Sequence, residues 1–111
     1  MPLLLAAALA VQACAFHDER GTLAYSPNPT PAFEAVGKPW FESGATIDYA
    51  GGVYAKLGPP RQLGPAEVEA AADREGVPFF IEAGNYAEKP EVLYVMVRSW
   101  DCSFQPYARN K

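Results

Sequence analysis

The 111-residue sequence has few of the residues that build catalytic or metal sites. It contains one histidine, His17, and two cysteines, Cys14 and Cys102. A cysteine nucleophile needs a neighbouring base, normally a histidine, to form its thiolate, and His17 is distant from Cys102 in the sequence. Zinc needs four ligands at regular spacing, whereas His17, Asp18 and Glu19 offer three adjacent groups. We therefore predict no Cys–His catalysis, no metal and no cofactor.

Paired carboxylates are also missing from the sequence pattern. Hydrolysis by two acids requires carboxylates that converge in one cleft. The candidates are spread along the chain without a common spacing: Glu42, Asp48, Glu82 and Asp101. We therefore predict a protein that is not an enzyme, and we keep a small carboxylate-dependent hydrolase as the enzymatic alternative.

Clusters of positive charge are absent as well. The nine lysines and arginines are scattered singly, and the net charge is −4. Proteins that bind nucleic acid usually present a basic stripe that displaces counterions from phosphates. We therefore expect no nucleic-acid partner.

The length allows one small domain, and eleven prolines and nine glycines without a period predict many turns instead of a repeat array.

No apolar run is long enough to predict a transmembrane helix, which takes about 20 residues. The run Leu3–Val11 instead has the length of the apolar region of a signal peptide, about 7–15 residues, and small residues follow it. The sequence therefore predicts export, with a signal peptide over residues 1–13, or over 1–15 if cleavage follows the Ala13-Cys14-Ala15 motif.

The segment Val11-Gln12-Ala13-Cys14 resembles the lipobox of bacterial lipoproteins, although Gln12 is larger and more polar than that pattern prefers. The resemblance implies a lipid on Cys14 and therefore a membrane as partner. Ala15 in place of an aspartate implies the outer membrane in a bacterium with two membranes. Cleavage after Ala15 would instead give a soluble secreted protein, and a third interpretation is a buried first helix that contains a core cysteine.

Residues 14–39 are predicted to form a proline-rich tether. Pro27, Pro29 and Pro31 alternate with other residues, which forbids a helix and favours an extended spacer. The alternative is an ordered segment that packs across the domain through Leu23, Tyr25 and Phe33.

Residues 40–111 are predicted to form a single α+β domain, a small antiparallel sheet of about five to six strands carrying one short helix. The alternative is a small, partly open β-barrel. A hairpin over 45–57 turns at Ala50-Gly51-Gly52, because glycines supply the positive φ of tight turns. Strands follow over 77–83 and 102–107, and the uninterrupted apolar run 92–97 predicts a strand buried on both faces.

The predicted helix covers residues 64–76. Pro65 stands at its first turn, Glu67 and Glu69 favour the positive end of the helix dipole, and Gly76 ends it. Its apolar face is thin, which predicts a helix that covers the sheet with small residues.

Aromatic residues in loops supply the candidate binding site. Trp40-Phe41 and Trp100-Asp101 have the composition of surfaces that stack a sugar or grip a side chain. The structural alternative is that Trp40 covers a sheet edge and Trp100 plugs a barrel end. For Cys102, we predict a buried small hydrophobe at a strand start, with a disulfide to Cys14 or an intermolecular bond as alternatives.

Taken together, these patterns favour a small lipoprotein of the cell envelope that acts as a non-enzymatic binding or structural module. Its expected partners are the membrane, through the lipid anchor, and either another envelope protein or a cell-wall glycan. The alternative is a secreted inhibitor or immunity-type protein, for which small size and acidity are typical.

Overall fold

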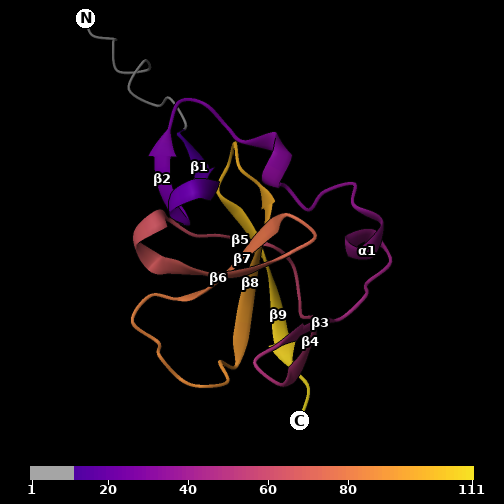
Figure 1. Ribbon diagram of the computed structural model, residues 1–111. Coiled ribbons are helices and arrows are strands. Elements are labelled where there is room, and N and C mark those ends of the chain that lie inside the picture. Colours follow the sequence, from indigo (N-terminus) through magenta and orange to yellow (C-terminus); the bar gives the residue numbers. More distant parts are fainter. Residues whose placement is uncertain (1–11) are drawn as a thin grey trace, which may run out of the picture.

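The computed structural model describes residues 12–111, so the signal-peptide prediction falls mainly on residues that lie outside that range. The described chain is built mostly from strands (Figure 1). In chain order they are β1 Ala13–His17, β2 Thr22–Ser26, β3 Ile47–Tyr49, β4 Gly52–Lys56, β5 Arg61–Gln62, β6 Val68–Arg74, β7 Val77–Glu82, β8 Val92–Arg98 and β9 Ser103–Arg109. The helical elements are single turns: η2 Asp18–Arg20, η3 Pro31–Phe33, α1 Pro39–Glu42 and η4 Pro65–Glu67.

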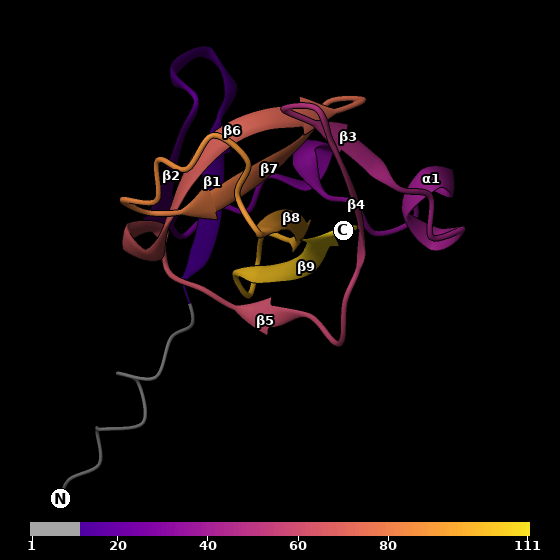
Figure 2. The same cartoon turned by 90° about the horizontal axis from the view of Figure 1, so that it is seen from below.

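The main sheet is antiparallel in every pair, with strand order β3-β4-β9-β8-β7-β6, and the short β5 pairs with a second stretch of β9. Seen along its strands, the sheet curls around on itself (Figure 2). Near the open side, the guanidinium of Arg74 at the end of β6 donates a hydrogen bond to the carbonyl of Thr46, just before β3. The predicted antiparallel sheet is confirmed, and its half-barrel form fits the partly open barrel that was the alternative.

The central strands are apolar on both faces, because the side chains of a strand alternate between its two sides. On β8, Leu93, Val95 and Val97 belong to one buried cluster, while Met96 belongs to another. The first cluster fills the inside of the curled sheet: Ala35, Trp40, Phe41, Ile47, Tyr54, Val77, Phe79, Leu93, Val95, Val97 and Tyr107. The second lies on the outer face: Cys14, Phe16, Leu63, Val68, Phe80, Met96, Cys102 and Phe104. The predicted two-sided burial of 92–97 is confirmed.

The hairpin predicted over 45–57 is confirmed as β3 and β4. Tyr49 pairs with Gly52 across a two-residue turn, and both turn residues, Ala50 and Gly51, have positive φ, at 52° and 78°. Two positive φ values match the twist of the flanking strands.

The helix predicted over 64–76 is wrong. After the single turn Pro65–Glu67, the chain runs as the edge strand β6 and pairs with β7. Glu75 and Gly76, with φ of 50° and 87°, form a tight hairpin turn in place of a helix end. Helix propensity is worth less than about 0.7 kcal/mol per ordinary residue, and the thin apolar face of this segment offers no helical stripe to outweigh pairing with β7. Within residues 12–111 the longest α-helix is the four-residue α1, so no helix there is long enough to cross a membrane.

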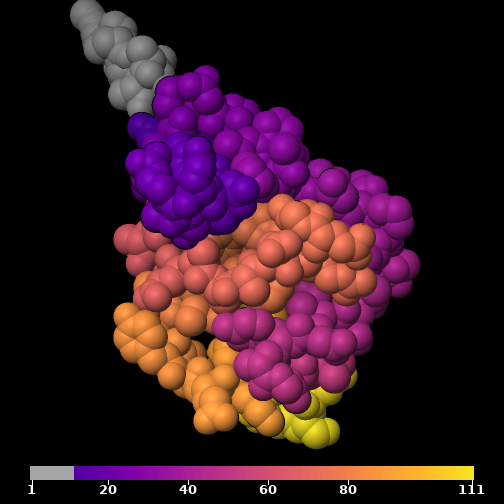
Figure 3. Space-filling view, viewed as in Figure 1, coloured from indigo at the N-terminus to yellow at the C-terminus, as the bar shows by residue number. Residues whose placement is uncertain are grey.

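Residues 14–39 lie on the domain. The hairpin of β1 and β2 forms a separate two-stranded sheet, and the space-filling view shows it seated against the rest of the molecule (Figure 3). Phe16 contacts Phe33 and Phe80 in edge-to-face geometry, with ring centroids 5.1 and 5.9 Å apart. Leu23 and Phe33 pack against the outer cluster, as the ordered-segment alternative predicted, whereas Tyr25 is exposed.

Candidate binding site

The turn between β8 and β9, residues 99–102, presents a tryptophan to solvent. Trp100 is 55% exposed, and it is one of the few large apolar side chains of the described chain that remain on the surface. The first and last residues of the same turn, Ser99 and Cys102, are buried instead. The turn therefore has a buried base and an exposed aromatic tip.

Ser99 ties the base of the turn to three other segments. Its carbonyl accepts hydrogen bonds from the backbone N–H of Cys14 at 2.7 Å and of Cys102 at 3.3 Å. Its own N–H and hydroxyl both donate to one carboxylate oxygen of Glu34, at 2.9 and 2.7 Å. The hydroxyl also accepts from the N–H of Thr30 at 2.9 Å. Hydrogen bonds to a charged carboxylate are stronger than neutral ones, so the turn is held firmly from below.

A disulfide and the β5 segment hold the other side of the turn. Cys102 is bonded to Cys14, a partner 88 positions away in the sequence. The N–H of Leu63 donates to the carbonyl of Cys102 at 3.1 Å, and the side-chain amide of Gln62 donates to the carbonyl of Asp101 at 3.2 Å. Cys102 itself has a φ of 56°, a backbone conformation that needs such support in a residue with a side chain.

Arg98 and Asp101 flank the tryptophan. The Arg98 guanidinium carbon lies 5.8 Å from the ring centroid of Trp100, and its Nε is 3.4 Å from a carboxylate oxygen of Asp101. Arg98 also donates to the hydroxyl of Ser103 at 3.2 Å. The Asp101 side chain is only 12% exposed, and its second carboxylate oxygen is buried without a hydrogen-bond partner. Asp101 is therefore committed to the turn, and Trp100 is the group that remains free to contact a ligand.

Trp40 and Phe41 have a different role. Both are buried in α1 and belong to the inner cluster, with their rings in edge-to-face contact at 6.0 Å. The guanidinium carbon of Arg74 lies 5.0 Å from the Trp40 ring, and Lys56 Nζ lies 3.7 Å from the Phe41 ring. The structure does not join them to Trp100, which lies outside both clusters. The alternative in which Trp40 covers the sheet describes its position.

Cys14 has two mutually exclusive chemical assignments. In the structure its sulfur is bonded to Cys102, and its side chain is fully buried. A lipid anchor would require the same sulfur as a thioether, which a disulfide rules out. The disulfide and the predicted lipid therefore cannot occupy Cys14 in the same molecule. The disulfide also replaces the description of Cys102 as a free apolar thiol, because neither cysteine is free.

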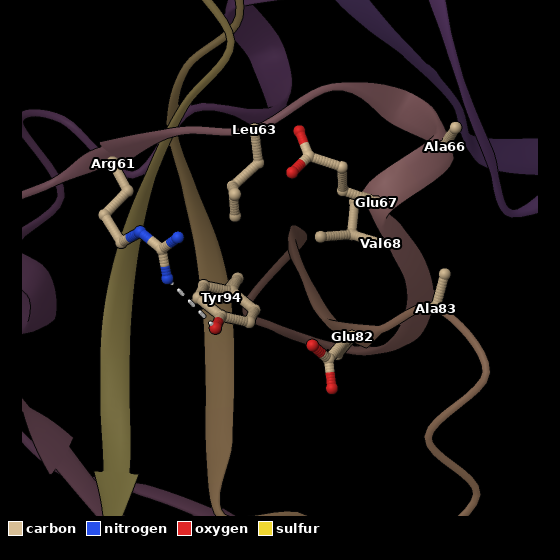
Figure 4. Close-up of a pocket in the computed structure, with 8 residues that line it drawn as sticks. All are labelled: Arg61, Leu63, Ala66, Glu67, Val68, Glu82, Ala83 and Tyr94. Atoms are coloured by element: carbon tan, nitrogen blue, oxygen red, sulfur yellow. Dashed lines mark hydrogen bonds between the residues drawn. The ribbon is translucent and has the colours of Figure 1, made fainter.

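A polar cleft of about 300 Å³ lies on another part of the surface, between β5, η4 and the end of β7 (Figure 4). On one wall, Arg61 Nη1 is 3.4 Å from the Tyr94 hydroxyl. Glu67 and Glu82 also line the cleft, but Figure 4 shows their carboxylates on opposite sides of the Val68 side chain. Glu67 moreover accepts the N–H of Gly64 at 2.7 Å. These two acids therefore do not form a converging pair.

The other candidate acids are dispersed. Glu42 accepts the N–H of Gly37 at 3.0 Å, Asp101 pairs with Arg98, and Asp48 is exposed on β3. Across the residues that the structure describes, no three His, Cys, Asp or Glu side chains gather as metal ligands would.

The perturbed ionisable groups lie away from the turn. Burial raises the pKa of Tyr107 to about 12, and burial also raises the pKa of Tyr54, whose hydroxyl donates to the Pro90 carbonyl at 2.6 Å. Hydrogen bonds from Lys111 and Arg109 lower the pKa of Glu91. Structural burial and ion pairing account for these shifts, and none of these groups adjoins Trp100.

Comparisons of the chain with protein-family models, with curated proteins and with solved structures found no match.

Proposed function

We propose that this protein is an exported, non-enzymatic binding module that grips a partner protein through Trp100. The observation that carries the proposal is the contrast within one turn: an exposed tryptophan stands on a base held by a disulfide and a network of hydrogen bonds. Tryptophan is enriched among the residues that dominate protein interfaces.

The rigidity of the turn has a direct energetic meaning for binding. Ordering a flexible side chain or loop on association costs about 0.5–1.5 kcal/mol for each immobilised side chain. Ser99, Asp101 and Cys102 are already held in the free protein, so the backbone of the turn has little freedom left to lose when Trp100 enters a partner's pocket. An exposed aromatic side chain on a rigid turn suits a recess in a partner protein.

The disulfide supports export. Disulfides persist in oxidising compartments outside the cytosol and are rare in reducing ones, and the bond between Cys14 and Cys102 is buried in the fold. We propose a soluble location in the envelope or outside the cell, because the cysteine that a lipid would occupy is used by the disulfide. An inhibitor of an exported enzyme is the alternative that the same rigid turn favours.

Site-specific photo-crosslinking in the native cell tests the proposal. A photoreactive amino acid replaces Trp100 in one variant and Tyr86 in a matched control, since Tyr86 is an 80% exposed aromatic on the separate loop between β7 and β8. We expect a defined protein adduct from position 100 only. Equal adducts from both positions, or an adduct with glycan instead of protein, would contradict the proposed surface.

Purified protein and the captured partner then give the affinity. Trp100→Ala should weaken binding by about 2 kcal/mol, or roughly 30-fold in Kd, whereas Tyr86→Ala should leave Kd unchanged. Both variants should keep the melting temperature nearly constant, because both side chains are exposed. Unchanged affinity in the folded Trp100→Ala variant would rule out the turn as the binding element.

A further inference from the structure

The polar cleft between β5, η4 and the end of β7 holds charges of both signs that do not pair with one another. Figure 4 shows Arg61 on one wall and the carboxylates of Glu67 and Glu82 on the facing wall. Within residues 12–111, no carboxylate oxygen lies within 4.0 Å of an Arg61 guanidinium nitrogen. Arg61 Nη1 contacts the Tyr94 hydroxyl, but at 3.4 Å this is a long hydrogen bond. The guanidinium therefore keeps most of its capacity to bind an anion.

The two acids have binding capacity left as well. Glu82, the last residue of β7, is exposed, and in the described part of the chain its carboxylate forms no ion pair. Glu67 uses one carboxylate oxygen to accept the N–H of Gly64, which leaves its other oxygen available. The two carboxylates lie on opposite sides of the Val68 side chain and do not converge on one point (Figure 4). Each acid can therefore take a cationic group of its own.

Backbone pairing fixes these walls in the free protein. Val68 is the strand partner of Glu82, and the N–H of Ala83 donates to the carbonyl of Glu67 at 2.9 Å. These bonds set the position of the two acids relative to each other. Arg61 is placed by the pairing of β5 with β9. The cleft is therefore preformed, and binding a ligand there requires little ordering of the backbone.

An apolar base lies between the charged groups. Leu63 and Val68 are only 6% and 5% exposed, and the partly buried Tyr94 packs against the same cluster. Figure 4 shows the side chains of Leu63 and Val68 directed into the space between Arg61 and the acids. Such a base can be covered by the aliphatic stem of a charged molecule. An apolar floor with a few polar groups at its rim is the composition of small-molecule sites.

Size and charge define the class of ligand. A cleft of about 300 Å³ is at the lower end of the range for small-molecule sites. One guanidinium that faces two carboxylates complements a molecule with one carboxylate and two cationic groups. A free basic amino acid has this set, because an aliphatic stem joins its side-chain cation to an α-carboxylate and an α-ammonium. A polyamine would leave Arg61 without an anion, and a neutral sugar would leave all three charges unpaired.

We propose that this cleft binds a free basic amino acid, lysine or arginine, with its carboxylate at Arg61 and its two cationic groups at Glu67 and Glu82. The Arg61 guanidinium donates to the carboxylate of the ligand, and the aliphatic stem covers Leu63 and Val68. Trp100 does not line the cleft, so this site is separate from the surface proposed for a partner protein.

Titration of the disulfide-bonded protein with L-lysine tests the site. At fixed pH and ionic strength, amide chemical shifts should change saturably and cluster at residues 61–68 and 82–83. Three analogues each lack one charge: lysinamide lacks the carboxylate, norleucine the side-chain cation, and Nα-acetyl-lysine the α-ammonium. Each should bind roughly fivefold more weakly, the upper range for one exposed ion pair. Shifts that do not saturate, or an analogue that binds as tightly as L-lysine, would overturn the proposal.

Two variants remove the protein's side of the same contacts. Arg61→Gln and Glu82→Gln should each weaken L-lysine binding roughly fivefold. Arg61→Gln should also bind L-lysine and lysinamide equally, because the carboxylate of the ligand has lost its partner. Continued preference for L-lysine in the Arg61→Gln variant would contradict the assignment. Both residues are exposed, and the analogue series uses the parent protein and needs no variant.

Matched controls separate a local contact from the effect of net charge. Glu19 and Arg20 are exposed on η2 and do not line the cleft. Glu19→Gln and Arg20→Gln change the net charge by the same amounts as the two cleft variants and should bind L-lysine as the parent protein does. Equal weakening in the controls and the cleft variants would show that the overall charge, and not this cleft, attracts the ligand.

Discussion

At the scale of single residues, the described part of the chain buries several polar atoms without giving them partners. These are Trp40 Nε1, a carboxylate oxygen of Asp101, the Tyr107 hydroxyl and Arg109 Nε. A buried polar group that lacks a hydrogen bond costs about 1–3 kcal/mol. Tyr107 is the simplest case, because it is fully buried on β9 in the inner cluster and its hydroxyl is its only polar atom.

Replacing this hydroxyl tests the energetic argument. Tyr107→Phe should raise the free energy of unfolding by about 1 kcal/mol at neutral pH, because it removes an unpaired buried group and keeps the ring. Tyr54→Phe is the matched control and should lose about 1 kcal/mol, since its hydroxyl donates to the Pro90 carbonyl. Denaturant unfolding measures both, and strong destabilisation by Tyr107→Phe would contradict the absence of a partner.

The same residue predicts a response to alkaline pH. Its pKa is raised to about 12 in the folded state, while an unfolded tyrosine ionises near pH 10. Between these values the unfolded chain releases a proton that the folded chain keeps, so stability falls as pH rises through this window. Tyr107→Phe should show a smaller loss between about pH 9 and pH 12. An equal loss in both proteins would show that Tyr107 does not cause it.

At the scale of elements, β6 shows how local signals can support two structures. The sequence predicts a helix between Pro65 and Gly76, whereas the structure has the strand β6 there. Proline starts either element, and the positive φ of Gly76, 87°, suits a helix end as well as a hairpin turn. The decisive contacts are with β7, which pairs with β6 from Val77 to Glu82.

The turn between β6 and β7 gives a direct test of the hairpin. Gly76→Ala should destabilise the fold by about 1–2 kcal/mol, because a residue with a Cβ is strained at positive φ, although nothing crowds the added carbon. Gly76→Asn should cost less, since asparagine tolerates this region. Thermal unfolding of the two variants measures the difference. Equal stability of Gly76→Ala and the parent protein would contradict the turn.

At the scale of the whole molecule, the disulfide joins the amino-terminal hairpin to the far end of the sheet. The two cysteines are separated by 88 positions. Reducing the bond therefore opens a long loop and gives the unfolded chain much more conformational freedom. The loop-entropy model assigns roughly 4–5 kcal/mol to a closure of this size, which is a large share of the stability of about 5–15 kcal/mol typical of small domains. The hairpin that the bond holds also supports the Trp100 turn.

Reduction of the disulfide should therefore lower the stability of the folded protein by about 4 kcal/mol. Denaturant midpoints with and without reductant measure the change. A double variant, Cys14→Ala with Cys102→Ala, should have a low midpoint that reductant no longer alters. If the parent protein unfolds at the same denaturant concentration in both conditions, the bond contributes little to the fold.

Much of the sheet followed from the sequence alone. The run 92–97 has no polar interruption and the length of a strand, which favours a strand buried on both faces, and β8 has this burial. The hairpin of β3 and β4 could also be predicted from the sequence, because its glycines lie between two short segments of alternating residues. The exposed position of Trp100 was not, since a turn tryptophan can equally fill a barrel end.

Local composition determined where the hairpin of β3 and β4 and the buried strand β8 fall, because side-chain alternation and positive φ act within a few residues. Only the tertiary structure decided what depends on contacts between distant segments. These are the pairing of β6 with β7, the burial of Trp40, and the joining of Cys14 to Cys102. The disulfide forms because folding brings Cys14 on β1 next to Cys102 in the β8–β9 turn. No local sequence pattern predicts that proximity.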